Sequence, residues 1–268
     1  MLLGVNMMKY LKVAGAFYRY CLIRLLEFRS EFWTWSLVSP GWGFLSLATI
    51  LLIFNQVNDI AGWTRTEVVL TSVAGSIFMS LLWWMVFPSL YNFMELIRTG
   101  GFDFYLLKPI NSQFLVSVSR FEFDNYLRVV IMVGLLIFLG LTGYITATLA
   151  SVVCFVVTIF FGLIIFYSFF FIISTLAIWL INIEGIEDFF DSVITLGRYP
   201  TYIYNGVLRV VFFYIIPMAF VATFPIKVLL GKTGLETVVL SGLMAGGFLL
   251  ASHKFWLFAL SHYSSASS

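Results

Sequence analysis

The chain has 268 residues, of which 61% are hydrophobic, 19% aromatic and only 10% charged, and its mean hydropathy is +1.01. Soluble domains carry about 25% charged residues, so this composition excludes a water-soluble globular protein. The formal net charge of +2 is too small for a nucleic-acid binder. We expect an all-α integral membrane protein in which residues 1–268 form a single membrane domain.

The first predicted element is an amphipathic helix over residues 7–30. On a helical projection its charged side chains gather on one side and its apolar side chains on the other. The charged side is made by Lys9, Lys12, Arg19, Arg24 and Glu27, and the apolar side by Leu11, Ala14, Tyr18, Cys21, Leu22 and Leu25. Such a helix suits the interface between anionic lipid head groups and acyl chains. We interpret it either as a simple surface anchor or as an elbow helix that also contacts a partner.

Windows without charge predict six membrane-spanning helices. One crossing needs about 20 apolar residues. Windows of 27 uncharged residues follow Glu31 and Glu67, and a window of 55 covers 129–183. This last window is far too long for one crossing and must fold back at the glycines and threonines of 140–146. The predicted spans are about 32–54, 68–90, 126–141, 148–181, 207–230 and 237–258, with possible kinks at Pro40 and Pro217.

The positions of Lys and Arg predict the topology. Cytoplasmic flanks of membrane helices retain positive charge. With both termini in the cytoplasm, 12 of the 15 Lys and Arg residues lie inside, and only Arg65, Lys227 and Lys232 lie outside. We therefore predict that both termini are cytoplasmic.

The loop after the second span, residues 91–111, has an unusual mixture of side chains. A short helix through Ile97 is expected to end at Gly100 and Gly101, and Pro109 ends the stretch that follows. Charged side chains alternate there with large apolar ones, which suits a groove on another protein better than bulk water. Phe102 and Phe104 are expected to anchor the loop. The alternative is a solvated turn with alternating charge.

A third cytoplasmic segment, 184–194, is acidic on one side. On a helix its four carboxylates share one arc of about 100°, opposite Ile186, Phe189, Phe190 and Val193; the acidic residues are Glu184, Glu187, Asp188 and Asp191. This stripe fits a basic partner or a cationic substrate. It equally fits the solvated side of a surface helix.

The sequence lacks the motifs of several common kinds of functional site. The two histidines, His253 and His262, have no zinc-ligand spacing around them. Gly231-Lys232-Thr233 resembles the end of a phosphate-binding loop, but Ile226 occupies the required glycine position. The spans contain essentially no ionisable residue, which disfavours an ion-coupled carrier. We predict no metal site and no catalytic or nucleotide site on this chain.

Several ordered motifs resemble a prokaryotic family of ABC type-2 exporter permeases. The motifs are Glu95-Leu-Ile-Arg-Thr-Gly-Gly with Leu106-Leu-Lys-Pro109, Arg198-Tyr-Pro200, Ile216-Pro217, Phe224-Pro225 and Tyr263-Ser-Ser-Ala-Ser267. The resemblance implies six spans, an elbow helix and a permease in the cell (inner) membrane that a separate ATPase drives. ATP and Mg then belong to that ATPase, and this chain has no cofactor.

The resemblance also implies roles for two groups of residues. It implies a coupling element to the ATPase between the second and third spans, at Glu95, Arg98, Gly100, Gly101, Asp103, Phe104, Lys108 and Pro109. We expect the acidic residues of 184–191 to form a secondary contact. Members of the family often pair with a second, related permease, so a heterodimer or a homodimer in membrane lipid is implied. The alternatives are a non-transport membrane scaffold or assembly factor and, less favoured, a secondary carrier.

Overall fold

The computed structural model describes residues 7–27, 29–56, 62–144, 147–180, 184–196 and 216–263, and the regular elements in these ranges are helices joined by short loops. Its α-helices are α1 Met7–Glu27, α2 Arg29–Ile53, α3 Arg65–Met85, α4 Phe87–Thr99, α5 Asp103–Leu106, α6 Ser112–Ser117, α7 Tyr126–Leu141, α8 Leu149–Thr175, α9 Glu184–Leu196, α11 Thr223–Leu229 and α12 Leu235–Ser261. Two short 3-10 helices are η1 Leu176–Ile178 and η4 Met218–Phe220.

Four of the described segments are long and apolar enough to cross a membrane. They are Arg29–Ile53, Arg65–Thr99, Leu149–Ile178 and Leu235–Ser261, and α7 is a shorter apolar helix of 16 residues. The prediction of an all-α protein with several membrane helices is therefore confirmed for these segments. The count of six spans and the cytoplasmic location of both termini stay predictions.

The predicted span over 207–230 differs from a single helix in its described part. Residues 207–215 lie outside the described residues, and from Ile216 onward the chain forms η4 and then the seven-residue α11. Pro217 has no backbone N–H, so it cannot donate the hydrogen bond that would continue a helix through this point. Pro225 is tolerated because it stands in the first turn of α11, where amide groups have no helical partner. The kink expected at Pro217 is thus a break.

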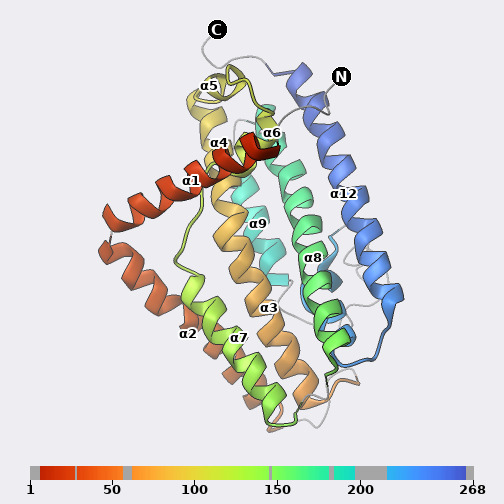
Figure 1. The fold of residues 1–268 in the computed structure, drawn as a ribbon. Helices are drawn as coiled ribbons and strands as arrows, with labels where there is room; N and C mark the ends of the chain where they lie inside the picture. Colours follow the sequence, from red (N-terminus) through yellow and green to blue (C-terminus); the bar gives the residue numbers. More distant parts are fainter. Residues whose placement is uncertain are drawn as a thin grey trace.

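The long helices have a simple directional arrangement (Figure 1). α3 and α4 follow one another along nearly the same line, and α8 and α12 lie side by side and run in the same direction. Because both α8 and α12 begin at the end opposite α5, the chain between them has to return along the bundle. The described parts of that return are α9 and the η4–α11 segment, both of which contact α8.

Aromatic side chains fill the centre of the bundle. The largest fully buried ones come from α3, α4, α8, α9 and α12, and include Phe78, Phe87, Phe93, Phe166, Phe170, Phe171, Phe190 and Trp256. Gly162 of α8 lies so close to Phe78 and to the carbonyl oxygen of Phe220 that a Cβ atom would meet both at 2.9 Å. This close approach brings η4 against α8.

Helix α1 crosses the other helices at an angle and ends beside α2 (Figure 1). It covers the loop between α6 and α7: the Tyr18 ring lies edge-on to Phe121 and Phe123, and the backbone N–H of Phe121 donates to Cys21 Sγ. Much of its apolar side, including Leu11 and Leu22, is exposed. These features fit an amphipathic elbow helix that lies on a lipid surface.

Candidate functional site

The loop that joins α4 to α6, residues 100–111, will be called the docking loop. It begins at Gly100, which has a left-handed φ of 74° and whose N–H donates to the Ile97 carbonyl. At Gly101 a Cβ atom would lie 2.9 Å from Leu96 Cδ2. The first glycine therefore supplies a backbone conformation that costs other residues energy, and the second supplies space. The predicted end of the helix at this glycine pair is confirmed.

Phe102 attaches the docking loop to the core. Its side chain is fully buried, and its ring meets Phe93 of α4, Trp256 of α12 and Tyr263 at centroid distances of 5.4, 5.8 and 5.2 Å. All three contacts have the edge-to-face geometry that aromatic rings prefer. Residues of α4 and of the C-terminal part of the chain thus contact one side chain of the loop.

A hydrogen bond holds the same loop to the end of α12. The Tyr263 hydroxyl donates to Asp103 Oδ1 at 2.9 Å. Burial and then the neighbouring Asp103 carboxylate raise the pKa of Tyr263 to about 12. The hydroxyl therefore remains protonated, and remains a donor, throughout the physiological pH range.

The second half of the docking loop contacts α1. Lys9 Nζ donates to the Pro109 carbonyl at 3.1 Å, and Lys108 Nζ lies 6.0 Å from the centroid of the Phe17 ring of α1 and 4.4 Å from that of Tyr105 in the loop itself. Asn111 then starts α6 by accepting a hydrogen bond from the Phe114 backbone N–H at 3.1 Å. The loop is consequently fixed to α1, α4, α6 and α12 and does not project freely.

Large apolar side chains project outward from this fixed frame. Phe104 is 69% exposed and Leu107 is 79% exposed. The expectation that Phe104 anchors the loop is therefore wrong, and Phe102 alone of the two is buried. The exposed Phe104 and Leu107 will be called the apolar tip.

An ion pair on α4 precedes the loop. Arg98 binds both carboxylate oxygens of Glu95, with nitrogen–oxygen distances of 2.7 and 2.8 Å. Both side chains are exposed, so the pair adds little stability and leaves its outer surface accessible to another molecule.

The acidic segment forms α9, as its periodicity predicts. Ile186, Phe190 and Val193 are buried, and the Phe190 ring packs 4.4 Å from that of Phe170 in α8. Phe189, expected on the same apolar side, is 42% exposed. Asp188 is exposed. The side chains of Glu184, Glu187 and Asp191 lie outside the described part of the structure, so the proposed acidic stripe stays a prediction.

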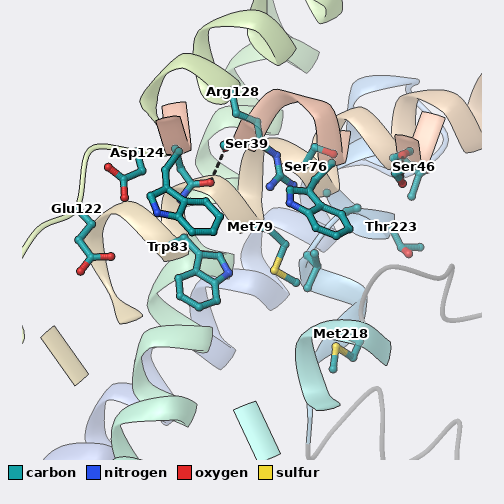
Figure 2. A pocket seen from close by; sticks show the side chains of 18 of the residues that line it. Ser39, Ser46, Ser76, Met79, Trp83, Glu122, Asp124, Arg128, Met218 and Thr223 are labelled. Atoms are coloured by element: carbon teal, nitrogen blue, oxygen red, sulfur yellow. Dashed lines mark hydrogen bonds between the residues drawn. The ribbon is translucent and has the colours of Figure 1, made fainter. Parts of the chain in front are cut away.

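A cavity of about 560 Å³ lies between α2, α3, the start of α7 and the η4–α11 segment. In Figure 2 Glu122 and Asp124 lie at one end, Ser46 and Thr223 lie at the other, and Met79, Trp83 and Arg128 lie between them. The full lining is Glu31, Trp35, Ser39, Trp42, Ser46, Thr71, Ser72, Gly75, Ser76, Met79, Trp83, Glu122, Asp124, Asn125, Arg128, Met218, Val221, Ala222 and Thr223.

The charged end of the cavity has an acidic local field. Burial first, then the Glu122 and Glu31 carboxylates, raise the pKa of Asp124 to about 6. Glu122 itself binds Arg120 at 3.0 Å. Asn125 follows Asp124 in the chain, and its Oδ1 accepts a hydrogen bond from Ser39 Oγ at 2.9 Å (Figure 2). This bond joins α2 to the start of α7 and fixes the mouth of the cavity.

Only part of this cavity can be predicted from the sequence. The polar side chains of the predicted spans that line it include Trp35, Ser39, Ser72 and Ser76. The charged residues at its mouth stand outside the uncharged windows, so the pattern that predicts the spans does not point to them. The usable signal is their position, because Glu31 and Asp124 stand just before the predicted spans 32–54 and 126–141, and Arg128 lies at the start of the second of these.

Comparison with known proteins gives one match. The family described as "ABC-2 family transporter protein" matches residues 41–267. No curated protein matches the chain, and no solved structure matches it. The matched region includes the docking loop, the acidic helix α9 and most of the residues that line the cavity.

Proposed function

Because the match extends over most of the chain, the protein belongs to the ABC-2 transporter family, and we propose that it is the permease subunit of an ATP-driven exporter in the cell (inner) membrane. In this proposal the ATPase is a separate protein, and a second permease, either related or identical, completes the transport pathway. ATP and Mg bind to the ATPase, and this chain contributes no cofactor.

The observation that carries the proposal is the apolar tip on a firmly packed loop. Exposed apolar side chains are typical of protein contact sites when they stand on a fixed frame. Closure of an ATPase pair can move the membrane helices only through an element that does not deform when it is pushed. The docking loop meets this requirement, since Phe102 and Asp103 connect it to α12 while Gly100 connects it directly to α4.

Other residues support a contact on the same side. Glu95 and Arg98 offer charged groups next to the apolar tip, as a polar rim around an apolar centre does in many interfaces. The exposed Asp188 and its acidic neighbours on α9 are proposed as a secondary contact to the ATPase. With this side of the bundle in the cytoplasm, Lys9 of α1 and Tyr263 after α12, which both contact the docking loop, are cytoplasmic as well.

The phosphate-loop resemblance at Gly231-Lys232-Thr233 has a structural explanation. Gly231 has a φ of +65° in the turn between α11 and α12, and Lys232 Nζ pairs with Glu67 Oε1 at 2.6 Å. The turn therefore connects the ends of α3 and α12. We propose that it plays no part in nucleotide binding.

Site-specific photo-crosslinking tests the proposed partner. p-Benzoyl-phenylalanine is introduced at Leu107 in cells that express the chain natively, and crosslinked proteins are identified by mass spectrometry. Leu149 is the matched control, since it is similarly exposed, at 82%, but starts α8 at the opposite end of the bundle. We expect an ABC ATPase at position 107 and not at 149. Failure to capture an ATPase at 107, or equal capture at both positions, would contradict the proposal.

A further inference from the structure

The shape of the cavity points to an elongated occupant. Five of its lining residues, Glu31, Trp35, Ser39, Trp42 and Ser46, recur at steps of three or four along α2 and therefore share one side of that helix. From the first to the last of them the helix rises by about 22 Å. The charged end is near the start of α2, and the other end is well inside its apolar length.

The charged side chains of the cavity favour a cation. Three carboxylates and one guanidinium, that of Arg128, belong to the lining. Arg24 of α1, and Arg120, which pairs with Glu122, line a smaller adjoining pocket beside the same carboxylates. Within the lining of the cavity itself, Arg128 is the cation that stands against Glu31, Glu122 and Asp124. The surroundings of Asp124 disfavour its ionised form, through burial first and then through the Glu122 and Glu31 carboxylates. A bound positive charge would relieve that repulsion.

The walls suit an organic cation. Trp35, Trp42 and Trp83 line the cavity, and indole faces attract positive charge, including the quaternary ammonium type. Met79 and Met218 add flexible, polarizable surface that adapts to apolar groups of different shapes. A metal ion is a poorer fit, since no group of three or more His, Cys, Asp or Glu residues within the described ranges is placed to hold one.

We propose that this cavity binds a lipophilic organic cation, an apolar body carrying one quaternary or protonated ammonium-like centre, and that molecules of this class are the transported substrate. The positive centre lies near Glu31 and Asp124, and the apolar body extends between the tryptophans towards Met218. The second part of this inference, that the occupant is transported, rests on the proposed permease function. The first part, that the cavity binds a cation, does not depend on an ATPase.

A pair of probes with opposite charge tests the binding. Tetraphenylphosphonium and tetraphenylborate have nearly the same size and apolar surface, so they differ mainly in the sign of their charge. Equilibrium dialysis of each radiolabelled ion against the full chain in lipid nanodiscs, corrected with empty nanodiscs, measures saturable binding. We expect saturable binding of tetraphenylphosphonium only. Equal or tighter binding of tetraphenylborate, or no saturable binding of the cation, overturns the proposal.

Substitutions locate the bound cation. Asp124→Asn keeps the side-chain shape and removes one negative charge, so the affinity for tetraphenylphosphonium should fall about tenfold. Glu31→Gln should act in the same direction from α2. The matched control is Glu236→Gln, which removes an exposed carboxylate at the start of α12, away from the cavity lining. Unchanged affinity in both cavity variants, or an equal loss in the control, rejects this location.

The pH dependence of binding provides a second readout. Asp124 lies between α6 and α7, outside the membrane-spanning helices, and its raised pKa means that it gains a proton as the pH falls through about 6. Cation affinity should therefore decrease from pH 7.5 to pH 5, and less so in Asp124→Asn. The other charged groups that face this site are Arg24 of α1, Glu31 of α2, Arg120 and Glu122 of the preceding segment and Arg128 of α7. A pH profile that is the same in both proteins argues against a role for Asp124.

The outcomes separate this inference from the proposed permease function. If position 107 captures an ATPase while the cation does not bind, the permease function stands and the substrate class is wrong. If the cation binds and no ATPase is captured, the cavity is a cation site in a protein with another role.

Discussion

Two phenylalanines in the docking loop, only two positions apart, should respond to alanine in opposite ways. Phe102 is fully buried between α4 and α12, whereas Phe104 is 69% exposed. Phe102→Ala removes the ring that meets Phe93, Trp256 and Tyr263. Phe104→Ala removes a ring from the surface. The first substitution therefore tests how the loop is held, and the second tests what the loop binds.

The two substitutions should lower the Tm by different amounts. Replacing a buried phenylalanine by alanine costs about 3–5 kcal/mol, and at about 2–4 °C per kcal/mol for chains of this size the Tm should fall by roughly 6–20 °C. An exposed substitution costs within about 0.5 kcal/mol. The Tm of Phe104→Ala should accordingly stay within about 2 °C of wild type.

The assay combines stability with ATPase association. Each variant is purified from native membranes in mild detergent, its Tm is measured by thermal denaturation, and the amount of co-purified ATPase is determined. We expect Phe104→Ala to lose ATPase or to uncouple ATP hydrolysis from transport at a normal Tm. The reasoning fails if Phe104→Ala lowers the Tm as much as Phe102→Ala, or if Phe104→Ala retains ATPase and transport at wild-type levels.

Three further predictions concern residues in the turns at the two ends of the bundle. Gly100→Ala forces alanine into a φ of 74° and should lower the Tm by about 2–4 °C, for a cost of about 1 kcal/mol; an unchanged Tm in a thermal scan would contradict the left-handed geometry. Lys232→Ala breaks a half-exposed ion pair with Glu67, so it should lower the Tm by less than about 4 °C and leave the ATPase activity of the complex intact; lost ATPase activity would point to a nucleotide role. In a cysteine-free background, Thr142→Cys should react with an impermeant thiol reagent added outside intact cells and Thr99→Cys should not, whereas labelling at position 99 would exclude a cytoplasmic docking loop.

The sequence alone determined the class of protein and the local shape of its main elements. Uncharged windows longer than a bilayer crossing predict membrane helices because hydrocarbon excludes charge. The glycine pair at 100 and 101 predicts the end of α4 because few other residues adopt its backbone geometry without cost. The periodicity of 184–194 likewise predicts a helix with one apolar side. Each of these conclusions depends only on residues that are near one another in the chain.

Only the tertiary structure decided which side chains meet. Phe102 and Phe104 have the same chemistry and nearly the same position, and the difference in their burial arises from Trp256 and Tyr263, more than 150 residues away. The cavity likewise combines Glu31 of α2 with Asp124 and with Met218 of η4. Periodicity indicates which side of a helix is apolar but not which helix covers it, because packing depends on the shapes of both surfaces. For this reason the local elements could be predicted from the sequence, whereas the cation-binding cavity became visible only when the helices were placed together.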